Sequence, residues 1–127
     1  MLTYDDTVTT LRSIVDDFGP EYRPTGDRCI YFDDGGTPVC IIGHLIDRTF
    51  GDKDLRSRII NEIPKGAYRT LNCIPVWSEY FWPVIAPYFE PDNRIQNVLG
   101  CVQRLQDQGL NWGEALTKSL GDGNAHV

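Results

Sequence analysis

The sequence predicts a mainly helical α+β domain, with about five helices and a small antiparallel hairpin near residues 21–33. Several segments have apolar residues at helical spacing and are bounded by glycine or proline. Residues 21–33 are instead rich in strand-forming and turn-forming residues. The length of 127 residues suits one domain. We place that domain at residues 1–120 and expect a flexible tail at 121–127.

A first amphipathic helix is expected over residues 6–18. Thr3 or Asp5 can cap its N-terminus, and Gly19-Pro20 follows its end. An apolar stripe on such a helix is normally buried against the rest of the domain. The residues of this stripe are Val8, Leu11, Val15 and Phe18.

Between residues 21 and 33 the pattern favours a hairpin. Tyr22-Arg-Pro24 and Cys29-Ile-Tyr-Phe32 are strand-like, and Thr25-Gly26-Asp27 between them is a turn sequence. We therefore expect two short antiparallel strands here, docked on the helices.

A second helix is expected from Pro38 to Phe50. Thr37-Pro38 follows a glycine-rich turn and is typical of an N-cap with proline in the first helical turn. The helix is apolar on most of its circumference, which indicates a central position. Its Gly43, like Gly100 later in the chain, costs about 1 kcal/mol relative to alanine. We expect another element, or the helix of the other glycine, to approach the backbone closely at these two points.

The rest of the chain is expected to contain further helices and one irregular section. Residues 74–91 contain four prolines, which limit any helix there to one or two turns. Regular helices are expected at residues 52–62, 92–108 and 111–120.

The acidic balance of the chain argues against some classes of partner. The net charge is −6, and residues 1–36 alone carry eight acids against three bases. Proteins bind the nucleic-acid backbone with clustered Lys and Arg, so direct binding of this kind is not expected. A basic protein partner stays open, as does mimicry of DNA by the acidic surface.

The sequence also predicts a cytoplasmic protein that does not enter membranes. Its apolar runs are far shorter than the roughly 18 residues that a membrane span needs. Its first residues lack the basic and apolar parts of a secretory signal. We interpret the four cysteines as buried thiols of a reducing compartment.

Cys29, Cys40 and His44 are weak candidates for a zinc site. Cys40 and His44 are four residues apart on one helical face, and Cys73 or Cys101 would have to supply the fourth ligand. The paired short spacings of strong zinc motifs are missing. The same thiol and imidazole could act as nucleophile and base, but burial in an apolar helix opposes that use.

No motif in the sequence points to a cofactor or to catalytic residues. Gly35-Gly36 lacks the lysine and the spacing of a phosphate-binding loop. The three pairs of adjacent aspartates point apart, and caps and turns explain them. The sequence therefore predicts neither catalytic residues nor a bound cofactor.

The proline-broken section holds six of the fourteen aromatic residues. We expect most of them in the core, but complete burial of so many rings is difficult in a small domain. Tryptophan and tyrosine concentrate binding energy at protein interfaces. We therefore predict a partner-binding surface formed by Trp77, Tyr80, Phe81, Trp82, Tyr88 and Phe89.

Two segments resemble small uncharacterised accessory proteins of actinobacteria and their phages, especially mycobacteriophages. The first is Cys29-Ile-Tyr-Phe-Asp-Asp-Gly-Gly-Thr-Pro-Val-Cys-Ile-Ile-Gly-His44, followed by Gly51. The second is Gln106-Asp-Gln-Gly-Leu-Asn-Trp-Gly-Glu-Ala-Leu116. The resemblance implies a non-structural phage product in the host cytoplasm. Such products often bind a host protein, and some are toxic when overproduced. No catalytic or binding residue is implied.

These observations together favour a binding function. We expect a non-enzymatic phage accessory protein that binds, and in the stronger form of the hypothesis inhibits, a host cytoplasmic protein. Two alternatives stay open: an enzyme or small zinc protein built on Cys40 and His44, and an acidic inhibitor that mimics DNA through the first helix and Asp33-Asp34. An edge of the small sheet, or the aromatic section, could also form a symmetric homodimer.

Overall fold

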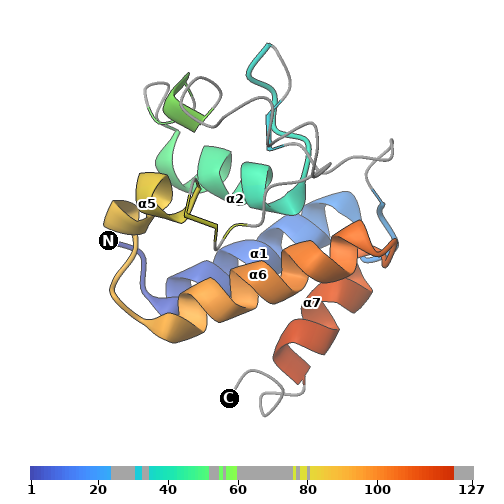
Figure 1. The fold of residues 1–127 in the computed structure, drawn as a ribbon. Coiled ribbons are helices and arrows are strands. Elements are labelled where there is room, and N and C mark those ends of the chain that lie inside the picture. The colour runs from blue at the N-terminus through green and yellow to red at the C-terminus, as the bar shows by residue number, and fades with distance from the viewer. Residues whose placement is uncertain are drawn as a thin grey trace.

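Helices α1 and α6 run side by side, α2 packs across α1, and α7 turns back along α6 (Figure 1). The described part of the chain is mainly helical, as the sequence predicts. Its elements are α1 (Tyr4–Phe18), α2 (Ile41–Phe50), α5 (Trp82–Ile85), the 3-10 helix η1 (Ala86–Tyr88), α6 (Asn93–Asp107) and α7 (Trp112–Gly121). The computed structural model describes residues 1–23, 31–32, 35–51, 55, 57–59, 76, 78–79 and 81–121.

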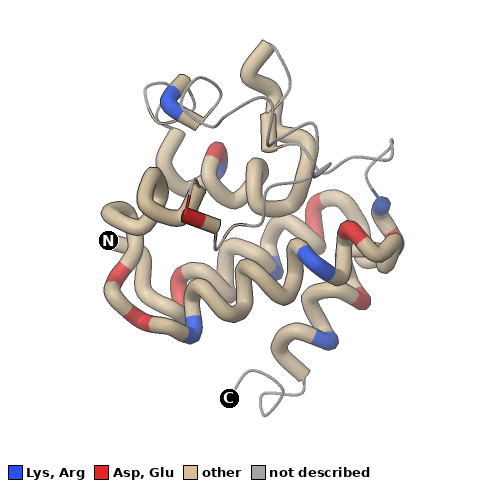
Figure 2. The backbone as a smooth tube through the Cα atoms, in the orientation of Figure 1, with Lys and Arg blue, Asp and Glu red and all other residues tan. Residues whose placement is uncertain are grey.

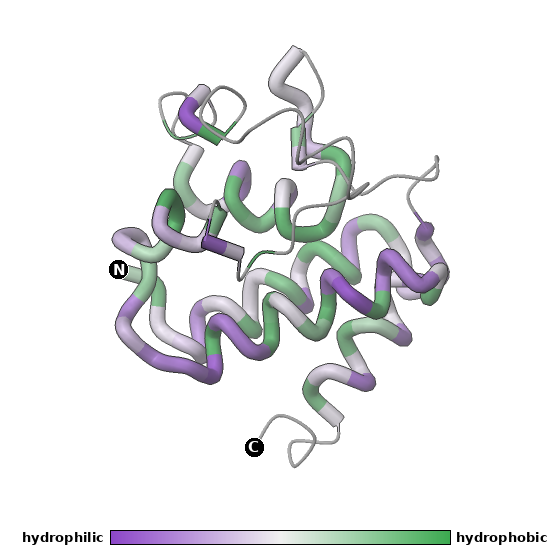
Figure 3. Tube along the Cα trace, viewed as in Figure 1, coloured by the Kyte–Doolittle hydropathy of each residue, from purple (hydrophilic) through white to green (hydrophobic). Residues whose placement is uncertain are grey.

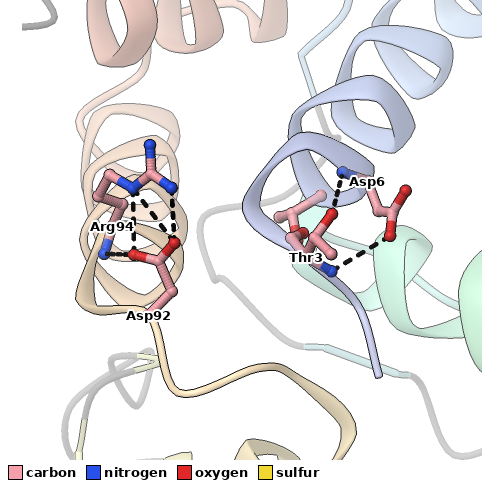
Figure 4. A network of polar contacts seen from close by, with 5 residues as sticks. Thr3, Asp6, Asp92 and Arg94 are labelled. Atoms are coloured by element: carbon pink, nitrogen blue, oxygen red, sulfur yellow. Dashed lines mark hydrogen bonds and ion pairs between the residues drawn. The ribbon is translucent and has the colours of Figure 1, made fainter.

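Helix α1 confirms the first predicted helix, and the structure shows which of the two candidate residues caps it. The Thr3 hydroxyl accepts a hydrogen bond from the Asp6 N–H at 3.0 Å, and the Asp6 carboxylate accepts one from the Thr3 N–H at 3.2 Å (Figure 4). This reciprocal pair satisfies two N–H groups that the helix itself leaves without partners. The cap is therefore Thr3 rather than Asp5, and the helix begins two residues earlier than the apolar pattern indicated.

Helix α2 begins at Ile41, so the prediction of a start at Pro38 is wrong. Cys40 is the N-cap, and its Sγ accepts a hydrogen bond from the Gly43 N–H at 3.4 Å. Before it, the Val39 N–H donates to the Tyr31 carbonyl at 3.0 Å, and Pro38 forms an isolated bridge with Phe32. These contacts hold residues 38–39 in an extended form, which outweighs the local preference of Thr37-Pro38 for a helix start.

The predicted hairpin near residues 21–33 finds no support in the described part of the chain. Residues 24–30 and 33–34 lie outside that part, and the described residues form isolated bridges but no strand. The carbonyls of Pro20 and Tyr22 accept hydrogen bonds from the first N–H groups of α7, at 2.7 and 2.9 Å. The backbone next to the predicted strand thus caps a helix instead of pairing in a sheet.

The close approach predicted at Gly43 is confirmed. A Cβ added there would lie 2.0 Å from the carbonyl oxygen of Tyr31, so only glycine fits without a backbone shift. The approaching element is the segment before α2, rather than the helix that contains Gly100. The glycine that looked costly for helix propensity therefore allows two pieces of backbone to touch.

The remaining predicted helices agree with the structure where it describes them. Residues 74–91 give the short pieces α5 and η1, while α6 and α7 lie within about two residues of their predicted bounds. Of the helix predicted at 52–62, residues 55 and 57–59 are described and helical. No described helix is both long and apolar enough to cross a membrane.

The core lies between α2 and the inner faces of α1 and α6, where Figure 3 shows the hydrophobic positions. Two buried glutamines of α6 add polar contacts to it. The Gln103 carbonyl accepts from the Val76 N–H at 2.7 Å, and its amide donates to the Tyr31 hydroxyl. The Gln106 carbonyl accepts from the Ile41 N–H at 3.0 Å and from the Trp112 ring N–H at 2.8 Å. Helix α6 therefore fixes the start of α2 and the start of α7 through one side chain.

Candidate binding surface

The structure places Cys40 and His44 in different surroundings. Cys40 is 1% exposed and caps α2 through its sulfur, whereas His44 is half-buried one turn further along the helix. Cys29 and Cys73 lie outside the described residues, and Cys101 is a half-buried free thiol rather than a fully buried one. Within the described ranges, no three His, Cys, Asp or Glu side chains gather as a metal site. The cap contact and the burial explain why the helix has a cysteine at position 40.

His44 belongs to a cluster of four rings with Phe18, Tyr22 and Trp112. Its ring centroid lies 4.7 Å from that of Phe18 and 5.6 Å from that of Trp112, both in edge-on geometry. Burial lowers the pKa of His44, the nearby positive charge of Arg48 lowers it further, and Asp47 acts in the opposite direction. The neutral imidazole is therefore the form that suits this cluster.

The six aromatic residues predicted as a partner surface have different positions. Phe81 and Phe89 are buried, at 0% and 1% exposure, and Phe81 stacks on Tyr31 with ring centroids 4.0 Å apart. Trp82 and Tyr88 are partly exposed and pack against the core from outside. Trp77 and Tyr80 lie outside the described residues. Of the described four, two belong to the core and two reach the surface.

Trp82 and Tyr88 join Phe50 of α2 in one surface, which we call the aromatic patch. The Phe50 and Tyr88 ring centroids are 4.8 Å apart, and Phe50 is 5.7 Å from the buried Phe89. Trp82 stacks on the other side of Phe89 at 6.0 Å. Phe89 thus contacts two rings of the patch, Phe50 and Trp82, and Tyr88 joins them through Phe50.

The backbone under the patch is also fixed. The Leu2 N–H donates to the Tyr88 carbonyl at 3.0 Å, and the Glu90 N–H donates to the Leu2 carbonyl at 2.9 Å. This short bridge ties η1 to the N-terminal segment, next to the capped start of α1. Prolines in the first turns of both α5 and η1 restrict the backbone further. The patch is therefore held in one arrangement before any partner binds.

The charges near the patch are acidic. From residue 70 to residue 93 the sequence has no Lys or Arg, but it has Glu79, Glu90 and Asp92. Figure 2 shows acidic positions on the segments before and after α5 and η1. Asp92 itself is neutralised by Arg94, whose guanidinium lies 2.8 Å away (Figure 4). In the sequence, the segment that carries Trp82 and Tyr88 is therefore flanked by the exposed Glu79 and Glu90, which suits a neutral or basic partner surface.

The acidic first helix is less free for DNA mimicry than its composition indicates. Asp6 belongs to the cap of α1, and Asp17 forms an ion pair with Arg48 at 2.8 Å. The Asp33-Asp34 turn lies outside the described residues. Two of the acids of α1 are thus engaged within the protein.

A groove lies between α1 and α7. Figure 1 shows α7 leaving the α1–α6 pair toward its C-terminal end. Two hollows of about 490 and 400 Å³ lie between the helices, and Arg12 and Leu120 line both of them. The groove closes where Gly113 meets Pro20, since a Cβ on Gly113 would lie 2.6 Å from that proline. The apolar residues along it include Val8, Val15, Leu116 and Leu120.

Sequence reasoning missed Phe50 and the groove. Phe50 is the last residue of α2, directly before Gly51 and at the edge of the apolar stripe. This position is the one sequence signal that could have indicated its partial exposure. The groove depends on the angle between two helices, for which the sequence gives no signal.

No protein-family model matches this chain, and no curated protein or solved structure matches it either. The function is therefore inferred from the surfaces of the protein itself.

Proposed function

We propose that the protein acts by binding another protein through the aromatic patch. The observation that carries this proposal is the group of partly exposed rings, Phe50, Trp82 and Tyr88, supported by the buried Phe89. Rings of this type supply large contact areas, and their fixed position reduces the entropy lost on binding. The bordering carboxylates favour a partner that presents basic residues around an apolar centre.

The class of partner follows from the resemblance of residues 29–44 and 106–116 to small phage proteins. In this proposal the protein is a phage accessory protein, and its partner is a cytoplasmic protein of the bacterial host. Binding at the patch would inhibit that protein by covering a surface it needs. The resemblance, rather than the geometry, supports the host and the phage origin.

The first test asks whether the patch is where a partner binds. A photo-crosslinking phenylalanine derivative is placed at Tyr88 or, as a control, at the exposed Gln108 at the end of α6. Both proteins are irradiated in an actinobacterial host lysate. We expect one protein to crosslink from position 88 and not from position 108. Equal crosslinking from both positions, or none from position 88, would contradict the proposal.

The second test measures affinity for the protein captured in this way. Trp82→Ala should weaken binding at least about tenfold, because tryptophans at interfaces are frequent hot spots. Phe18→Ala is the matched control, because Phe18 is 38% exposed but belongs to the ring cluster around His44. Circular dichroism of both variants confirms that they fold. If Phe18→Ala weakens binding as much as Trp82→Ala, the aromatic patch is not the binding surface.

A further inference from the structure

Two opposite charges in the α1–α7 groove have no partner among the residues that the structure describes. Arg12 and Asp16 are exposed, lie one helical turn apart and line the same hollow. Over the residues that the structure describes, neither side chain forms an ion pair or a hydrogen bond, whereas the adjacent Asp17 is paired with Arg48. The α7 side of the hollow is uncharged, so it offers them no partner across the groove.

We propose that a second copy of this chain docks in the groove, with its α1 antiparallel to the first. A two-fold axis at the level of Ile14 sets Arg12 opposite Asp16 of the partner subunit. Symmetry then repeats the same pair in the other direction. Each of these two charges then has one partner in the other subunit, and the dimer contains two such ion pairs.

The apolar residues of the groove fit the same arrangement. The ion pairs occupy the middle, since residues 12 and 16 are about 6 Å apart along the helix axis. Val8 lies one helical turn before Arg12, about 6 Å further along α1, and also lines the groove. By symmetry, an apolar Val8 contact then lies beyond the ion pairs at each end of the interface.

Helix α7 gives the docked helix a second wall. Leu120 is partly exposed on the α7 side of the groove, and Leu116 beside it is 5% exposed, so the α1 helix of the partner subunit would contact α1 and the Leu120 end of α7. The symmetric result is an antiparallel α1 pair flanked by two copies of α7, which is a four-helix arrangement. This interface is separate from the aromatic patch, so a dimer leaves the proposed partner surface unchanged.

A second copy fits better than an unrelated acidic or basic segment because the groove carries both signs of charge on one stripe. An isologous interface requires a surface that is complementary to itself. Arg12 and Asp16 meet this requirement as neighbours on α1, at equal distances from the proposed axis.

The test is the oligomeric state of the purified protein and of charge-reversed variants. Analytical ultracentrifugation from about 1 μM to about 1 mM should show a monomer–dimer equilibrium for the wild type. Arg12→Glu places like charges together twice per dimer and should weaken the dimer at least about tenfold. The double variant R12E/D16R restores both pairs with exchanged signs and should dimerise again.

Lys118→Glu is the matched control for the change in net charge. Lys118 is exposed on α7 but does not line the groove, so its reversal should leave the dimer intact. The proposal is overturned if the wild type stays monomeric at the highest concentration, if Arg12→Glu dimerises as the wild type does, or if the double variant fails to recover the dimer. Dimerisation that is lost in Trp82→Ala instead would assign the contact to the aromatic patch.

Discussion

The aromatic patch and the α1–α7 groove are attached to the same core by different means. In the patch, Phe50 and Trp82 contact the buried Phe89, and a backbone bridge to Leu2 holds the segment that carries Trp82 and Tyr88. Helix α7, one wall of the groove, is fixed at its start by the Gln106 contact with Trp112 and by the N–H groups that reach Pro20 and Tyr22. It then packs along α6 through the buried Ala115, Leu116 and Ser119. Beyond that start it diverges from α1 (Figure 1).

This difference suggests how one small domain can present two kinds of surface. Ring packing around a buried support produces a fixed, largely uncharged surface that suits a hot spot. Helix α7 packs on α6 but diverges from α1, and the partly exposed Val8 and Leu120 stay available to another helix on that side. The patch is complete in the monomer, whereas the groove leaves Arg12 and Asp16 unsatisfied.

The largest expected effect comes from Gly43→Leu, which should disrupt the core to which both surfaces are attached. Any Cβ at position 43 meets the Tyr31 carbonyl oxygen at 2.0 Å, and the Tyr31 ring stacks on Phe81 behind the patch. A clash with backbone cannot relax by a rotamer change. We therefore expect the free energy of unfolding to fall by more than about 3 kcal/mol, or the variant to fail to fold. Thermal unfolding measures this loss.

Gly121→Leu is the control for this variant. A Cβ at position 121 meets Thr117 at 3.8 Å. Because Gly121 also lines the groove, both proteins are compared at a concentration at which they are monomeric, and the melting temperature of the variant should stay close to that of the wild type. An unchanged melting temperature for Gly43→Leu would show that the close approach has no energetic importance.

A smaller and more local effect is expected from Gln106→Leu. The variant leaves the Ile41 N–H and the Trp112 ring N–H without their acceptor, and each buried unsatisfied donor costs about 1–3 kcal/mol. We expect the free energy of unfolding, measured with urea, to fall by about 2–4 kcal/mol. Gln108→Leu, which changes an exposed residue of the same type, should have little effect.

Hydrogen exchange of this variant sharpens the contrast between the two surfaces. If Gln106 holds the start of α7, amides of α7 should exchange faster, while those of α5 and η1 change less. Equal acceleration in both regions would mean that the patch and the groove are not attached independently.

The smallest expected effect is the pH dependence that arises from His44. Its pKa is lower in the folded state than the ordinary value of 6.5, so the unfolded chain binds its proton first as pH falls. The contribution of His44 to stability is therefore full above about pH 6.5 and decreases as pH falls below that value. Urea unfolding should show that the free energy of unfolding decreases as pH falls from about 7.5 to about 5, and that this decrease is smaller in His44→Phe. A wild type and variant with parallel pH curves would exclude this origin.

Parts of the fold could be predicted because their signals are local. The stripe of Leu11 and Val15, the Thr3 cap and the following Gly19 defined α1 within a few residues. The prolines of residues 74–91 limited α5 and η1 to single turns. The intolerance of larger residues at Gly43 was also readable, because a glycine in an apolar helix indicates a close neighbour.

Other parts failed because a distant contact outweighed a local preference. Thr37-Pro38 has the residues of a helix start, but the Tyr31 carbonyl binds the Val39 N–H and keeps that backbone extended. The hairpin predicted near residues 21–33 stays without support in the described part of the chain, where the Tyr22 carbonyl accepts the Trp112 N–H. Neither hydrogen bond could be inferred from the local preference of the residues that form it.

The sequence by itself determined where helices form, which faces are apolar and that the aromatic section is irregular, since these follow from periodicity, caps and proline. Only the tertiary structure decided which rings are buried and which reach the surface, because burial depends on what packs against them. Phe89 supports the patch and Trp82 belongs to it, although both come from the same proline-broken section. The groove, in which Arg12 and Asp16 have no partner among the described residues, depends likewise on the divergence of α1 and α7, which no local pattern encodes.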